Sequence, residues 1–171
     1  MNNETIGTIL ARRSIRKYED KPVEREKIDR ILECACAAPS AKNFRPWHFV
    51  EITERKTLDA LADALPYGKM LAQATLAIVV CGEPERENSN PWWEQDCSAA
   101  MQNMLVAATA LGLGSVWLGV NHNADVSEKV REIVGIPDHI QAMGIAAIGY
   151  GAQHKPGHSG IDQGCVHKDR W

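Results

Sequence analysis

Four cationic side chains and one hydroxyl lie within six positions near the start of the chain: Arg12, Arg13, Ser14, Arg16 and Lys17. Two neighbouring guanidiniums offer forked hydrogen bonds that match the oxygens of a phosphate monoester. The hydroxyl adds a neutral donor, and Arg16 returns to the side of Ser14 if the segment is extended. The run is typical of a binding site for a small anionic ligand, although a solvated basic face has the same composition.

A second polar stretch, PSAKNFRPW, places Pro39, Ser40, Asn43, Arg45 and Pro46 between an expected helix and an expected strand. Polar groups in a loop stiffened by two prolines suit the edge of a planar heterocycle, because asparagine offers both a donor and an acceptor. The alternative is a capping turn in which Ser40 and Asn43 satisfy backbone groups.

A glycine-rich phosphate loop is not what the sequence predicts. The stretch GLGSVWLG follows an expected helix and precedes an expected strand, which reverses the strand–turn–helix order of a dinucleotide fingerprint. No GxxxxGK[ST] motif occurs either. If the chain binds a phosphate, side chains must therefore hold it.

Cysteine and histidine are the residues of this chain that could bind a metal or take part in redox chemistry. The five cysteines contain no CxxC pair, so we expect buried free thiols in a reducing compartment. His154, His158, Cys165 and His167 are possible zinc ligands, but their spacing matches no known finger. A surface tail with incidental histidines is the favoured interpretation, and no metal is expected.

Length and charge restrict the class of protein. The 171 residues suit one domain over 1–171, and the net charge of −3 argues against a nucleic-acid binder. The apolar run over 74–81 is too short to span a membrane, so no membrane partner is expected. Because the start of the chain is polar, no signal peptide is expected and a cytoplasmic location is predicted.

Hydrophobic periodicity predicts helices alternating with strands, which indicates a layered α/β or α+β domain. The helix over 94–111 is small or apolar almost all round, so we expect it to be buried at the domain centre or against a partner subunit. Thr53 is expected to open the third helix, and Gly135 with Pro137 to stop the last one. The expected helices are 4–13, 22–39, 54–65, 94–111 and one within 123–137; the expected strands are 47–53, 74–82, 115–120 and 141–151.

Four motifs in this order, RRSIRKY, PSAKNFRPWHF, GLGSVWLG and a terminal VHKDRW, resemble the FMN-dependent nitroreductase family, and in particular its short single-domain bacterial and archaeal members. The resemblance runs from about Thr5 to Trp171. It implies an α+β fold of three layers with a central mixed, mainly antiparallel sheet. It also implies a domain-entwined homodimer with FMN at the subunit interface.

The resemblance assigns roles to particular residues. Arg12, Arg13 and Ser14 would hold the FMN phosphate and ribityl chain, and Arg16 would lie toward the pyrimidine edge. Ser40 and Asn43, in the loop that begins at Pro39, would contact the cofactor across the subunit boundary, and Lys69 would approach the flavin N1/O2 edge. The segment Val116, Trp117, Leu118 and Gly119 would pass the isoalloxazine with its backbone amides near N5 and O4.

Two departures from the family pattern stand out. Arg45 replaces the usual glutamine, and the arginine or lysine expected after the GYP motif is missing, so Lys155 or His158 would have to substitute. The implied activity is ping-pong transfer from NAD(P)H through flavin N5 to nitroaromatics, quinones or similar small oxidants. No catalytic residue is required, although Arg16 and Lys69 would stabilise the anionic reduced flavin.

The sequence leaves the activity and the role of two tryptophans open. A relative with flavin-fragmenting or dehalogenating chemistry would share these motifs, and so would a non-catalytic flavin protein. Trp92 and Trp93 either line the substrate cleft or pack at the dimer edge.

Overall fold

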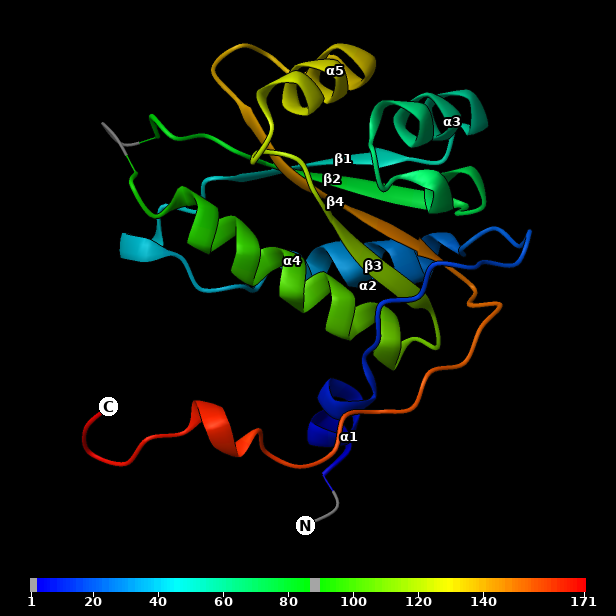
Figure 1. Cartoon of the computed structure of the whole chain (residues 1–171). Helices are drawn as coiled ribbons and strands as arrows, with labels where there is room; N and C mark the ends of the chain where they lie inside the picture. The colour runs from blue at the N-terminus through cyan, green and yellow to red at the C-terminus, as the bar shows by residue number, and fades with distance from the viewer. Residues whose placement is uncertain (1–2, 87–89) are drawn as a thin grey trace.

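The computed structural model describes residues 3–86 and 90–171 and arranges the body of the chain in three layers around one sheet (Figure 1). The strand order is β1-β2-β4-β3, and each neighbouring pair is antiparallel. Parallel pairing enters through an isolated bridge between Ser14 and Ser115. The strands are β1 (Trp47–Ile52), β2 (Leu76–Gly82), β3 (Gly114–Gly119) and β4 (Gln141–Gly149).

Helices cover both faces of the sheet, with α3 and α5 on one side and α2 and α4 on the other (Figure 1). This is the α+β architecture that the resemblance implied. The α-helices are α1 (Glu4–Ala11), α2 (Arg25–Cys36), α3 (Arg55–Ala64), α4 (Trp93–Ala110) and α5 (Ala124–Val134); the 3-10 helices are η1 (Ala41–Asn43), η2 (Lys69–Ala72) and η3 (Gln163–Cys165).

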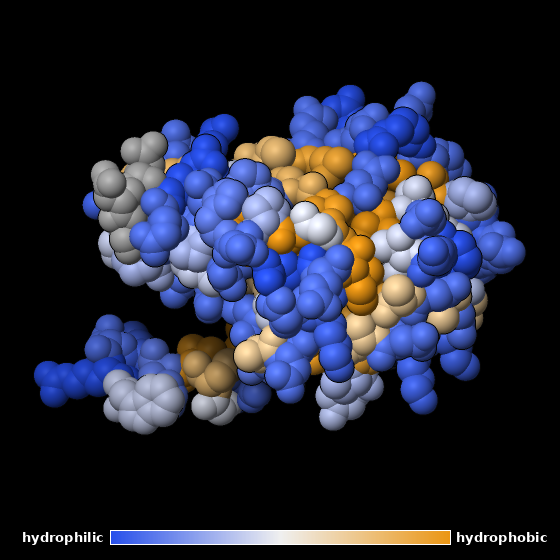
Figure 2. Space-filling view, turned by 90° about the horizontal axis from the view of Figure 1, so that it is seen from above, coloured by the Kyte–Doolittle hydropathy of each residue, from blue (hydrophilic) through white to orange (hydrophobic). Residues whose placement is uncertain are grey.

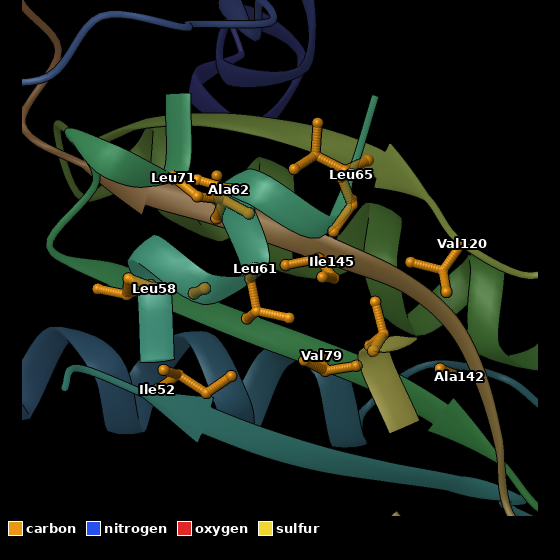
Figure 3. Packing of buried hydrophobic residues seen from close by; sticks show 14 of the residues in the cluster. Ile52, Leu58, Leu61, Ala62, Leu65, Leu71, Val79, Val120, Ala142 and Ile145 are labelled. Carbon is orange, nitrogen blue, oxygen red and sulfur yellow. The ribbon is translucent and has the colours of Figure 1, made fainter. Parts of the chain in front are cut away.

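Strand β2 shows why the core needs both helical layers. Its residues are buried along the whole strand, and alternate side chains face opposite ways. Leu76, Ile78 and Val80 join the cluster under α2 and α4. Ala77 and Val79 join the cluster under α3 and α5, part of which Figure 3 shows. An apolar strand of this kind is stable only when each face is covered.

Helix α4 connects the two segments that the sequence singled out for chemistry. It has 18 residues, so at a rise of 1.5 Å per residue it is about 27 Å long. Asp96, near its start, contacts loop 39–45, and residues beyond its end lie beside the basic run. The predicted burial of this helix holds for the side that faces the sheet and α2, whereas Gln102 and Ala110 are exposed.

The two ends of the chain bury little of their apolar surface. Helix α1 has no buried residue, and Ile6, Ile9 and Leu10 are 48%, 50% and 42% exposed. Beyond residue 155 the tail is exposed throughout, and Trp171 is fully exposed. The tail extends beside the body rather than packing on it (Figures 1 and 2).

Two sequence expectations fail at the level of single residues. Thr53 is not the N-cap of α3, because that position is Glu54, whose side chain makes no capping bond. The cysteines are all free, but the prediction of buried thiols holds for Cys81 and Cys97 alone. The prediction is wrong for Cys34, Cys36 and Cys165, which are exposed.

Within the described ranges, no helix has both the length and the apolar character needed to cross a bilayer. No three histidine, cysteine, aspartate or glutamate side chains converge as metal ligands in that part of the chain.

Candidate functional site

The basic run leaves α1 as an extended segment that lies on the outer edge of β3. Ser14 bridges Ser115, and the backbone N–H of Ile15 donates to the Ser115 carbonyl at 2.9 Å. Gly114 allows this close approach, because a Cβ there would stand 2.7 Å from Cγ2 of Ile15. Tyr18 anchors the far end of the run.

The buried Tyr18 hydroxyl donates to the carbonyls of Ile15 and Ala147, at 2.7 Å and 3.0 Å. Burial raises the pKa of this phenol, so it stays a donor over the whole physiological range. The contact explains why the run holds its extended shape. Sequence reasoning missed it, since a lone tyrosine after a charged run carries no local signal.

The arginines of the run differ in their partners. Arg13 is directed toward the start of the tail, where its Nε donates to the Pro156 carbonyl at 2.7 Å, and its Nη1 donates to the Arg12 carbonyl at 2.8 Å. Arg12, Ser14 and Arg16 form no side-chain hydrogen bond or ion pair with any described residue. In an extended chain, positions two apart share a side. The run therefore presents two guanidiniums and a hydroxyl together, and sets Arg13 apart from them.

Arginines without a carboxylate partner occur in both segments that the sequence singled out. Arg12, Arg16 and Arg45 form no ion pair with a carboxylate in residues 3–86 and 90–171. Ion pairs with carboxylates occur at Arg25, Arg30, Arg55, Arg86 and Arg131, whereas Arg170, in the exposed tail, has none among the described residues. The basic run therefore has positive charge that could attract an anionic ligand.

The start of the tail runs beside the basic run. Lys155 Nζ donates to the Ser14 carbonyl at 2.8 Å, and the backbone N–H of His158 donates to the Leu10 carbonyl at 2.8 Å. A cavity of about 340 Å³ lies against Arg13, Lys155 and Gln153, and Gln153 Nε2 is buried there with no partner among the described residues. The candidates to replace the missing arginine are Lys155 and His158. Of these, Lys155 places its ammonium group beside the basic run, where it donates to a backbone carbonyl.

Loop 39–45 is fixed by its own polar side chains. Ser40 Oγ accepts the Arg45 backbone N–H at 3.0 Å, and Asn43 Oδ1 accepts Arg45 Nε at 3.0 Å. The turn interpretation is therefore correct for Ser40, which does satisfy a backbone group. The hydroxyl proton of Ser40 and the amide nitrogen of Asn43 stay available as donors.

The loop also has an unusual backbone. Lys42, Asn43 and Arg45 have φ angles of 50°, 59° and 49°, although none of them is glycine. This left-handed region is unfavourable for L-residues, and segments that hold it are often functional.

A buried carboxylate that the sequence did not reveal keeps this loop in place. Asp96, 5% exposed, accepts the Ala41 backbone N–H at 2.9 Å and Asn90 Nδ2 at 3.1 Å. Sequence reasoning could not single it out, because an acidic residue in the first turn of a helix, as Glu94 also is, is common for local reasons.

The two halves of the predicted site do not meet within one chain. Loop 39–45 lies at the start of α4, and the basic run lies beyond its end (Figure 1). Lys69, on η2, is exposed and has no hydrogen-bond or ion-pair partner in the described part of the chain. On β3, the side chains of Val116 and Leu118 are buried toward α3 and α5, so that segment offers its backbone.

Comparison with known proteins gives a consistent result. The model of the nitroreductase family matches residues 9–67 and 63–150. A protein of Methanothermobacter thermautotrophicus is 40% identical over 98% of this chain and 88% of its own length. It carries the name "Putative NADH dehydrogenase/NAD(P)H nitroreductase". A solved structure from Parabacteroides distasonis carries the same name and is 42% identical, with a TM-score of 0.95 over 99% of this chain and 100% of that one. An FMN-dependent nitroreductase from Clostridium difficile R20291 is 34% identical with a TM-score of 0.91, over 97% and 99% of the two chains.

Proposed function

This chain belongs to the nitroreductase family, and on that premise we propose that it is an FMN-dependent NAD(P)H oxidoreductase acting on nitroaromatics, quinones or similar small oxidants. The observation that carries the proposal is the side of the basic run formed by Arg12, Ser14 and Arg16, which has donors and positive charge but no described partner. The proposed FMN-binding unit is a single domain over residues 1–171.

The residues fit the cofactor. Arg12 and Ser14 would hold the phosphate by charge-assisted hydrogen bonds, and Arg16 would face the pyrimidine edge. Lys155 would support Ser14 through its carbonyl, and Arg13 would fix the tail beside the run. The free amide of Asn43 and the hydroxyl of Ser40 suit the edge of a planar ring.

Bound FMN would supply the redox chemistry, accepting a hydride from NAD(P)H and passing electrons to the oxidant in a ping-pong sequence. The chain's own residues bind and orient. Arg16 would stabilise negative charge at the pyrimidine edge electrostatically. Lys69 would do the same if it lies near the flavin in the dimer. No acid–base pair is needed for these roles.

We also propose a homodimer, because one chain holds only half of a site at each end of α4. The surface supports it: α1 leaves Ile9 half exposed, and a groove of about 590 Å³ runs between α1 and α4 along Val106, Ala107 and Ala110. Apolar surface of this kind is typical of an interface between subunits. Ser40 and Asn43 of one chain would then reach the cofactor held by the basic run of the other.

The test is an absorbance spectrum of the purified protein with and without added FMN, followed by anaerobic titration with NADH and with NADPH. We expect a flavin spectrum that either nucleotide bleaches and that menadione or nitrofurazone restores. Sedimentation should give twice the chain mass of 18.9 kDa. A protein that is colourless as purified and binds no added FMN contradicts the proposal. A protein that binds FMN but shows no turnover indicates a non-catalytic flavin protein. Aerobic loss of flavin absorbance after reduction would instead indicate flavin fragmentation.

A further inference from the structure

Cationic and aromatic side chains gather on the surface around loop 39–45. We call Lys42, Phe44, Arg45 and Trp92 the cation–aromatic rim. Lys42 Nζ lies 5.7 Å from the ring centroid of Phe44 and 5.9 Å from that of Trp92. These distances are within the range of cation–π attraction, so the rim combines positive charge with aromatic faces.

The structure separates the two adjacent tryptophans. Trp92 is 45% exposed beside Lys42, whereas Trp93 is partly buried and packs against the core under α2 and α4. Of the pair, Trp92 is therefore the one placed to meet a ligand.

The rim is held in one shape before any ligand arrives. Lys42 and Arg45 both have left-handed backbones, and the Arg45 backbone N–H and guanidinium are bonded to Ser40 and Asn43. The Ala41 amide is tied to the buried Asp96. A preorganised loop loses little conformational entropy on binding, which favours recognition.

The positive charge of the rim is directed outward. Neither Lys42 nor Arg45 ion-pairs with a carboxylate among the residues described, and both are exposed. By contrast, Arg86 is paired with Glu83.

We propose that the cation–aromatic rim selects aromatic oxidants that carry an anionic group, such as a carboxylate. The ring would stack on Trp92 or Phe44, and the anionic group would lie near Lys42 and Arg45. This inference rests on the proposed function, since Ser40 and Asn43 bring the same loop to the partner subunit's flavin. Two adjacent cations also raise the local concentration of an anionic substrate.

The test uses the holoenzyme reduced anaerobically with NADH and measures its reoxidation by nitrobenzene and by 4-nitrobenzoate. The readout is the ratio of the two second-order rate constants, which cancels general loss of activity. We expect Lys42→Gln and Arg45→Gln each to lower the preference for the anionic oxidant about two- to fivefold, the range of one exposed ion pair. Raising the ionic strength should also lower the preference of the wild-type enzyme for 4-nitrobenzoate over nitrobenzene.

Lys129→Gln, which removes an exposed lysine from α5, is the matched control and should keep the wild-type ratio. A ratio that is the same in wild type, Lys42→Gln and Arg45→Gln overturns the inference. It is also overturned if these variants change the preference for NADPH over NADH instead, because the rim would then recognise the nucleotide phosphate. Failure of the proposed function is distinct: it would show as no bound FMN, or no reoxidation by nitrobenzene or menadione.

Discussion

Arg12 and Arg13 are neighbours in the sequence, but their guanidiniums have different surroundings. Arg13 is bonded to two backbone carbonyls, one of them in the tail, while Arg12 has no described partner. A guanidinium already bonded to the protein contributes less to a ligand than one that is free. The sequence interpretation gave both arginines to the phosphate. We propose instead that Arg12 binds the ligand and that Arg13 positions the tail.

We predict that Arg12→Ala weakens FMN binding about 10- to 100-fold, the loss of one or two charge-assisted hydrogen bonds. Arg13→Ala should weaken it much less, because its effect is to release the Pro156 carbonyl. Titration of the apoprotein with FMN, followed by flavin fluorescence, measures both. Lys17→Ala removes the same charge from an exposed neighbour and serves as the control. A larger effect at Arg13 than at Arg12 would contradict the assignment.

Two buried thiols make stability depend on alkaline pH. Burial raises the pKa of Cys81 and of Cys97 from 9.0 to about 12. Below pH 9 both states keep the proton, so the thiols' contribution is fully present. Between the two values the unfolded thiols ionise while the folded ones do not, and the free energy of unfolding falls as pH rises. Tyr18, whose pKa burial also raises, adds to this loss at higher pH.

We therefore expect urea unfolding at a fixed protein concentration to give a steady free energy up to about pH 8.5 and a decline above it. The slope should reach up to about 1.4 kcal/mol per pH unit for each thiol. The double variant Cys81→Ala, Cys97→Ala should be less stable at neutral pH but show a flatter decline above pH 9. An equally steep decline in that variant would mean that other groups control the alkaline limit.

At the scale of elements, loop 39–45 is bonded to a residue of α4 that lies 55 positions away in the sequence. We predict that Asp96→Ala lowers the free energy of unfolding by about 1–3 kcal/mol, because it leaves the Ala41 N–H and the Asn90 amide without their acceptor. FMN binding should weaken as well, since Ser40 and Asn43 lose their fixed position. Asp96→Asn should be intermediate, as its oxygen still accepts one of the two donors.

Glu94→Gln is the control for charge, because Glu94 lies in the same first turn of α4 and is exposed. Chemical denaturation and FMN titration of the three variants separate stability from cofactor binding. If Asp96→Ala binds FMN as tightly as wild type, the loop does not depend on this carboxylate for its function.

The elements that sequence reasoning found are those with local signals. Helix α5 has Asn123 as its side-chain N-cap and ends at Gly135 with φ of 68°, and both features can be predicted from residue type alone. The left-handed loop escaped prediction because Lys42 and Arg45 are not residues that favour this region. Its shape comes from the local bond between Ser40 and the Arg45 N–H and from Asp96, which is a tertiary contact.

The candidate site was predictable as a set of residues but not as an arrangement. Which side of the basic run faces a ligand depends on the bridge between Ser14 and Ser115, and that register joins segments about 100 positions apart. The sequence likewise could not show that Lys155 bonds to a backbone carbonyl. Chemistry follows residue type, whereas orientation follows long-range pairing.

At the scale of the whole molecule, two independent observations support the proposed dimer. The donors of loop 39–45 and those of the basic run are separated by the length of α4, about 27 Å at 1.5 Å per residue. Apolar side chains of α1 and of the tail, including Ile9 and Trp171, stay exposed. The proposed twofold dimer would account for both, because each surface and each half-site would then meet its complement on the second copy.

Mixing two defective variants tests this arrangement directly. Arg12→Ala, Arg16→Ala impairs the basic run, and Ser40→Ala, Asn43→Ala impairs the loop, so each homodimer should bind FMN poorly. In a mixed dimer one site collects both defects and the other collects none. After the two variants are unfolded together and refolded at equal concentration, half of the dimers are mixed, so about a quarter of all sites should bind FMN as in wild type.

The recovered sites should also show NADH-dependent menadione reduction, since a complete site needs no contribution from its defective neighbour. Refolding each variant alone is the control, and it should recover neither binding nor activity. If the two half-sites instead belong to one chain, every site in a mixed dimer keeps one defect, and mixing restores nothing. The recovered fraction thus decides whether α4 separates two parts of one site or two halves that a second subunit must join.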